Sequence, residues 1–181
     1  MSISGKEEKI KFKGQSWSYQ ERDSKSRYVK SQTIMLGRTS VSENTKLTLG
    51  SISFTMTGYQ PRKNEGPLTD PKLDLYWRYV GKTSERDKHY IGSFNSSNTT
   101  RKNEQYNGRQ YQWVGSTTKK EFNITETGDI EIMAKFSATI TKKQLWDYPY
   151  VSVNIGDITC ETTSSFNAPN NCIYITKSGI I

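Results

Sequence analysis

The longest regular alternation of apolar and polar residues in the chain covers residues 129–141. Apart from Met133, the residues between its apolar positions are polar or charged. Because successive side chains of a β-strand point to opposite faces of the sheet, the pattern predicts one long strand with a buried and an exposed face. This strand would anchor a half-exposed antiparallel sheet. Its apolar positions are Ile130, Ile132, Ala134, Phe136, Ala138 and Ile140.

Shorter stretches with the same period predict further strands along the chain. One begins near Lys46 and changes phase at Gly50, which indicates a bulge or bend. Proline, glycine and polar residues predict a loop over 60–69, and the segment 95–109 predicts a long exposed loop. Residues 141–148 predict one helical turn. The remaining predicted strands cover residues 90–94, 111–114, 151–155 and 172–176.

The segment 70–81 predicts the one well-defined helix of the chain. Asp70 suits the N-cap, Pro71 the first helical position and Gly81 the residue after the last turn. A strand is the alternative, because apolar residues also recur there at every second position. The capping residues favour the helix. The helical stripe consists of Leu73, Tyr76, Trp77 and Val80, and the strand face of Leu73, Leu75, Trp77 and Tyr79.

Residues 1–45 predict a basic N-terminal arm, and residues 46–181 predict a globular β-rich domain. The arm has nine Lys and Arg residues against five acids, a net charge of +4 out of +8 for the whole chain. A segment of this composition buries too little surface to fold alone, which predicts a partly mobile arm or a solvated tail. The expected fold class is therefore α+β, an antiparallel sheet packed against one or two short helices.

The overall charge predicts anionic partners such as acidic lipid, nucleic acid or an acidic protein face, although a merely soluble basic surface is the alternative. No run approaches the ~18 apolar residues of a membrane span, and the N-terminus lacks a signal peptide, so a cytosolic location is expected. Cys160 and Cys172 are expected to be buried thiols, with a small disulfide as the alternative.

The sequence predicts a protein without enzymatic activity, cofactor or metal. His89 is the only histidine, and it lacks a local acid–base partner other than Asp87. Glycine-rich phosphate loops and metal-ligand spacings are absent from the sequence. Basic doublets at 62–63, 101–102, 119–120 and 142–143 indicate either one extended positive surface or ordinary solvated loop charge.

The order of short motifs resembles that of rhabdovirus matrix proteins. A basic arm is followed by Lys-Leu-Thr-Leu at 46–49, a helix containing Trp77, and Tyr-Ile-Gly at 90–92. A long loop then leads to Phe-Asn-Ile at 122–124, Gly128, and Ile-Glu-Ile at 130–132. The resemblance covers roughly residues 46–141. The arm lacks the proline-rich motif of animal members and the central loop is polar, which would suit a divergent plant member.

The resemblance implies a viral structural protein that self-associates, condenses the helical nucleocapsid and links it to the envelope during virion assembly. Its implied partners are the nucleoprotein–RNA complex, anionic lipid, the glycoprotein tail and other copies of the chain, and its implied location is beneath the envelope, with host cytoplasm and intracellular membranes. Membrane or nucleocapsid binding would fall to Lys6, Lys9, Lys11, Lys13, Arg22, Lys25, Arg27 and Lys30. Self-association would fall to Phe12, Trp17, Asn98, Arg101 and Lys102.

Two other functions remain open at this stage. The many short strands suit a β-sandwich viral capsid, fibre-head or movement protein. The tyrosines and tryptophans suit a secreted carbohydrate-binding module, which would pair Cys160 with Cys172. The segment 70–81 discriminates between the matrix protein and the β-sandwich: a helix there favours the matrix protein, and a strand favours the sandwich.

Overall fold

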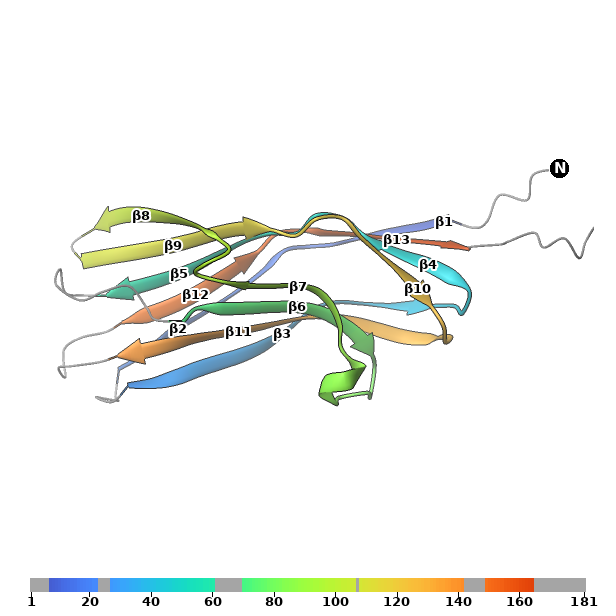
Figure 1. The fold of residues 1–181 in the computed structure, drawn as a ribbon, viewed down its shortest axis with the longest axis horizontal. Coiled ribbons are helices and arrows are strands. Elements are labelled where there is room, and N and C mark those ends of the chain that lie inside the picture. The colour runs from blue at the N-terminus through green and yellow to red at the C-terminus, as the bar shows by residue number, and fades with distance from the viewer. Residues whose placement is uncertain (1–6, 23–26, 61–69, 107, 142–148, 165–181) are drawn as a thin grey trace, which may run out of the picture.

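The computed structural model describes residues 7–22, 27–60, 70–106, 108–141 and 149–164. These residues form thirteen β-strands and one 3₁₀ turn, η1 (Glu85–Asp87), and none of these ranges contains an α-helix. The described segments accordingly include no helix long and apolar enough to cross a bilayer. All strand pairings are antiparallel and create three sheets (Figure 1).

Sheet C forms one layer of the molecule, and sheets A and B together form the other. Sheet C has the order β3 (Arg27–Val41), β11 (Gly128–Thr141), β6 (Lys72–Tyr79), β7 (His89–Asn95). Sheet A has the order β1 (Glu7–Phe12), β13 (Ile158–Ser164), β4 (Thr45–Leu49), β10 (Lys120–Ile124). Sheet B has the order β2 (Gln15–Gln20), β12 (Tyr150–Ile155), β5 (Ser53–Gln60), β9 (Gly108–Ser116), β8 (Thr100–Tyr106).

Sheets A and B are two halves of one bent layer, because four chain segments run from one sheet directly into the other. Their breaks fall at 13–14, 50–52, 117–119 and 156–157. Backbone hydrogen bonds join neighbouring breaks, including Gly50 N–H to Thr159 O and Gly156 N–H to Ser53 O. Gly14 is required at its break, since a Cβ there would lie 2.5 Å from the carbonyl oxygen of Ile155. The bend thus crosses the whole layer.

With these four segments joined, the sandwich contains eight long strands and the additional edge strand β8. In chain order, the bent layer has the first, eighth, third and sixth strands side by side, and sheet C has the second, seventh, fourth and fifth. The first strand pairs with the eighth, the second with the seventh, the third with the sixth and the fourth with the fifth. A long antiparallel hairpin rolled up in this way is a jelly roll.

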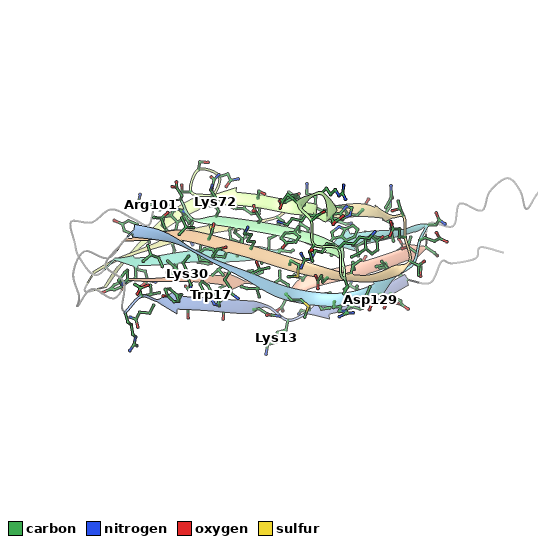
Figure 2. All side chains as sticks on the ribbon, turned by 90° about the horizontal axis from the view of Figure 1, so that it is seen from below. Lys13, Trp17, Lys30, Lys72, Arg101 and Asp129 are labelled. Carbon is green, nitrogen blue, oxygen red and sulfur yellow. The ribbon has the colours of Figure 1, made fainter. Side chains whose placement is uncertain are left out.

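Aromatic side chains from both layers fill the space between them. Trp17 contacts Phe136 with ring centroids 6.1 Å apart, and Phe54 contacts Phe94 at 4.5 Å. Figure 2 looks onto the edge of the sandwich where Trp17 and Lys30 lie, with Lys13 pointing to solvent. The buried positions of β11 are the six apolar residues predicted from the sequence, together with Met133 and Thr139. The prediction of a strand over residues 129–141 is therefore confirmed.

The predicted α+β class is wrong, because the segment expected to form the helix is strand β6 in the middle of sheet C. Asp70 has a φ of +53°, which is incompatible with an N-cap. Leu73, Leu75 and Trp77 alternate towards the core and are all fully buried. Pairing with strands on both sides satisfies the backbone of this segment, and this outweighs the local capping signals.

The predicted arm and central loop also contain strands. Within residues 1–45, β1, β2 and β3 all belong to the sandwich, and β8 and the start of β9 occupy the segment 95–109. Strand β13 was not predicted. The loop at 61–69, the helical turn after Thr141 and the strand at 172–176 lie outside the described residues.

Candidate interaction surfaces

An apolar row crosses the outer face of sheet C. Met133 lies opposite Met35 on one side and opposite Tyr76 on the other, and Tyr76 lies opposite Tyr90. Met35 and Tyr90, at the two ends of the row, are 49% and 43% exposed, whereas Met133 and Tyr76 are buried. The row exists because a bulge beside Met133 and another beside Tyr76 bring these residues into line on the outer face.

The 3₁₀ turn covers the Tyr76 end of this row and is fastened to it by charged hydrogen bonds. Glu85 accepts hydrogen bonds from the Nζ of Lys88 at 2.7 Å and from the hydroxyl of Tyr90. The same Nζ lies 4.8 Å from the ring centre of Tyr76, a cation–π contact. The hydrogen bond to Glu85 raises the pKa of Tyr90 to about 12, so this phenol stays protonated and keeps donating.

Charged side chains flank the apolar row on both sides. On one side, the Nε of Arg78 donates to Glu131 at 2.7 Å, in an ion pair of which both side chains are largely buried. On the other side, Lys135 and Asp74 lie opposite each other, and Asp74 accepts a hydrogen bond from Ser93 at 2.8 Å. Lys135 is exposed, and its charge interacts with the carboxylate of Glu85 on η1.

A second ion pair lies further along the same face. Asp129 accepts hydrogen bonds from the hydroxyl of Ser40 at 2.6 Å and from Arg38 at 3.0 Å. These donors hold the pKa of the Asp129 carboxyl below its usual value. Asp129 is thus ionised near neutral pH, and its negative charge is paired with the positive charge of Arg38.

The outer face of sheet B is chemically different, because its side chains are mostly uncharged. Tyr59 and Tyr150 lie opposite each other there, with ring centroids 5.3 Å apart. At the rim, Arg22 donates to Gln20 and Lys102 lies on strand β8. The hydroxyl and amide residues between these rims are Ser16, Ser18, Ser152, Asn154, Thr55, Thr57, Gln110 and Gln112.

The basic residues predicted to bind membrane or nucleocapsid do not form one cluster. Lys9 pairs with Glu161 at 3.0 Å and Lys11 pairs with Asp157 at 3.2 Å, on sheet A and at its bend. Lys30 instead lies over the ring of Tyr19, 4.1 Å from its centre, at the edge of the sandwich. The other residues of this set have different situations: Lys13 and Arg22 are exposed, Arg27 begins β3 but its side chain is not described, and Lys6 and Lys25 lie outside the described residues.

The residues predicted to mediate self-association are also separated. Phe12 and Trp17 pack against the core between the layers. The side chain of Asn98 accepts from the backbone N–H of Asn95 and donates to the carbonyl of Ser93, so it organises the turn before β8. Arg101 lies 4.6 Å above the ring of Tyr111, and Lys102 is exposed on the outer face of sheet B.

Sequence reasoning missed the apolar row on sheet C. Met133 was noted as the single apolar residue at an outward position of its strand, which was the available signal. Met35 and Tyr90 could not be aligned with it, since their register depends on two bulges. The face therefore becomes visible only when the strand pairing is known.

Cys160 is part of the buried interior, whereas His89 lies at the exposed start of β7. The ring of His89 stacks on Trp77 with centroids 3.9 Å apart, and burial lowers the pKa of His89. Burial raises the pKa of the Cys160 thiol to about 11. Within the described residues, no group of three or more His, Cys, Asp and Glu side chains could hold a metal ion.

The predicted resemblance to rhabdovirus matrix proteins is wrong. It required a helix over residues 70–81, and that segment is a central strand of a two-layer sandwich. The prediction of a matrix protein that condenses a nucleocapsid beneath an envelope depended on this resemblance and is therefore wrong as well. The alternative prediction of a β-sandwich agrees with the observed architecture.

No protein-family model matches the sequence, and no curated protein matches it. A solved structure of the Gx strain of infectious bursal disease virus is similar at 14% identity and a TM-score of 0.38, over 92% of this chain and 35% of that chain. The structure of the Gt strain is similar at 14% identity and a TM-score of 0.38, over 92% of this chain and 34% of that chain. The T13 particle of the same virus is similar at 10% identity and a TM-score of 0.25, over 83% of this chain and 39% of that chain. This chain thus spans about a third of the length of the first two.

Proposed function

We propose that this protein is a β-sandwich structural protein of the viral capsid type, a virion-associated building block that assembles with copies of itself. The strand order supports this proposal, because eight-stranded jelly rolls recur in viral capsid domains. Lectin and cupin domains share the same architecture, so the step from fold to function is an analogy.

Among the described residues, no α-helix packs on the outer face of either layer. In the predicted α+β fold, a helix would have covered one face of the sheet, whereas here the short turn η1 covers part of the outer face of sheet C. The two ends of the apolar row on that face, Met35 and Tyr90, are exposed, whereas Met133 and Tyr76 between them are buried. A protein that assembles with copies of itself needs surfaces of this kind through which the copies can associate.

Further copies of the chain are the one predicted partner that this function requires. The proposed role does not involve catalysis. An anionic partner remains a prediction that the charge of +8 supports. Four predictions followed only from the resemblance to matrix proteins and are not part of the proposed function: the nucleoprotein complex, anionic lipid and the glycoprotein tail as partners, and a position beneath an envelope.

Sedimentation velocity and negative-stain electron microscopy of the purified chain test the proposal. We expect discrete assemblies that grow with protein concentration. Because copies of net charge +8 repel each other, assembly should increase as salt screens this repulsion. A chain that remains monomeric over the whole range of concentration and salt would refute the proposal.

A further inference from the structure

We infer that two copies of this chain pair edge to edge along strand β3, in antiparallel orientation and about a two-fold axis that passes beside Gln32. This inference rests on the proposed function, since it names the element through which copies associate. The contact would join the two four-stranded sheets C into one continuous sheet. The partner is therefore the same strand of a second copy.

β3 offers the longest open sheet edge in the described part of the chain. It is the outermost strand of sheet C (Figure 1), and β11 is the one described strand that pairs with it. β3 has 15 residues, whereas the other edge strands have five to seven. An edge strand presents a row of backbone N–H and C=O groups with which another chain can pair, and short edges limit this pairing.

The regular part of β3 has a pattern that matches itself when it is read in the opposite direction. This part ends at Met35, because the register against β11 shifts between Met35 and Gly37. Around Gln32, hydroxyl residues occupy both neighbouring positions, and apolar residues lie three positions away on both sides. A two-fold contact uses the same segment of both copies, so it requires this symmetry. The matching pairs are Ser31 with Thr33 and Val29 with Met35.

In an antiparallel pair centred on Gln32, Val29 of each copy lies opposite Met35 of the other copy. Both side chains are on the outer side of sheet C, where they are 65% and 49% exposed, more than any other large apolar side chain among the described residues. Pairing would bring them into contact at both ends of the segment and would place Ser31 opposite Thr33. Apolar pairs and hydroxyl pairs across neighbouring strands both stabilise a sheet.

The basic residues of β3 are compatible with this register. Lys30 lies opposite Ile34, and its Nζ is 4.1 Å from the ring centre of Tyr19 in its own copy. The lysines of the two copies are four positions apart along the paired strands, about 13 Å. This separation exceeds the Debye length of about 8 Å at physiological ionic strength, so their repulsion is largely screened. Arg38 lies beyond the paired segment and forms an ion pair with Asp129.

The turn η1 does not obstruct this contact. It is hydrogen-bonded to Tyr90 on β7, which is the opposite edge of sheet C. Seven residues of each copy would exchange about six to eight backbone hydrogen bonds, because every second pair of an antiparallel ladder is hydrogen-bonded. A contact of this size is small, so we expect a dimer that depends on protein concentration and that suits a lattice of many repeated contacts.

A cysteine at the centre of the segment tests the register directly. The variant Gln32→Cys is made in a chain in which Cys172→Ser leaves Cys160, a buried residue, as the one natural cysteine. The two introduced cysteines would lie directly opposite each other, with Cα atoms about 4.5–5.5 Å apart, which is within the range of a disulfide. We expect a covalent dimer under mild oxidation, measured by non-reducing gel electrophoresis.

Val29→Cys and Met35→Cys provide the matched control in the same background. In a dimer of either variant alone, the two cysteines lie six positions apart, about 20 Å, which is too far for a disulfide. In an equal mixture, position 29 of one variant lies opposite position 35 of the other, so the covalent dimer should form in the mixture alone. Equal linking of each variant by itself would contradict the register.

Charges placed at the same two positions measure what the contact contributes to assembly. Val29→Lys/Met35→Lys sets lysine against lysine at both ends of the segment, and self-association should weaken about tenfold or more. Val29→Lys/Met35→Glu sets lysine against glutamate, so association should return. Both double variants replace the same exposed residues, and equal Tm values would show that folding does not cause the difference.

The outcomes separate this inference from the proposed function. Assembly that is weakened by the lysine–lysine variant, restored by the lysine–glutamate variant and accompanied by the Gln32→Cys dimer supports both. Assembly that both double variants leave unchanged, without the covalent dimer, overturns the β3 contact but leaves the proposed function intact. A natural chain that is monomeric under all conditions overturns both.

Discussion

A single methyl group added at Gly37 tests whether the N-terminal segment belongs to the sandwich. The ring of Phe12 on β1 lies directly against Gly37 on β3, in the opposite layer. A Cβ at position 37 would lie 2.5 Å from Cγ of Phe12 and 2.6 Å from both Cδ atoms. Carbon atoms in contact prefer a separation of about 3.5–4.0 Å, so the ring or the strand must move by about 1 Å.

The expected cost follows from two opposing effects. Overpacking a well-packed site typically costs about 1–3 kcal/mol. Alanine returns about 0.5–1 kcal/mol, because glycine in a strand interior is less favourable than alanine. We therefore expect Gly37→Ala to lower the free energy of unfolding by about 1–2 kcal/mol. For a chain of this length, that lowers Tm by about 2–8 °C.

Urea unfolding followed by tryptophan fluorescence measures this cost, and a double-mutant cycle assigns it to Phe12. Phe12→Ala alone should cost about 2 kcal/mol, since the ring is only partly buried. In that background the clash is gone, and Gly37→Ala should be neutral or slightly stabilising. A natural unfolding midpoint for Gly37→Ala, or the same cost in both backgrounds, would refute the placement of β1 under β3.

Three further predictions concern the core. Leu75→Ala should lower the free energy of unfolding, measured in urea, by about 2–5 kcal/mol because Leu75 is fully buried. Val80→Ala should lower it far less, because Val80 is exposed. A larger effect of Val80→Ala than of Leu75→Ala would instead support the predicted helix over 70–81. Site-resolved mass spectrometry should find Cys160 protected from alkylation in the native state, and its raised pKa should reduce the stability of the fold as pH rises from 9.0 to about 11; rapid native labelling contradicts this. Because burial lowers the pKa of His89, its contribution to stability is present above pH 6.5 and lost as pH falls below that value. His89→Phe keeps the stacking on Trp77, so its stability relative to the natural chain should rise below pH 6.5 and would stay constant if His89 were not desolvated.

Local patterns predicted the strands whose two faces differ clearly. The segment 129–141 alternates over its whole length, and the structure contains the strand with the expected buried side. The segment 151–155 behaves in the same way as β12. Such strands are predictable because burial of one face imposes a period of two on the sequence itself.

The segments at 7–41 and 70–81 misled the sequence reasoning for a common reason. β1, β2 and β3 are rich in charged and polar residues, because each lies at an edge of a sheet and exposes most of its side chains. β6 is apolar on its core face and also buries Tyr76 on its outer face, which produces a helix-like spacing. In each case the state of the segment is decided by neighbouring strands that are distant in the sequence.

The outer face of sheet C shows the same division. The charges at 131 and 135 around Met133 can be read from the sequence, but their relation to Asp74 and Arg78 exists only after β6 and β11 pair. The sequence by itself determined the strand-forming alternation, the basic charge and the residues available at each surface. Only the tertiary structure decided the eight-stranded order, the bend and the alignment across two bulges, because strand partners are fixed by long-range pairing that no local pattern encodes.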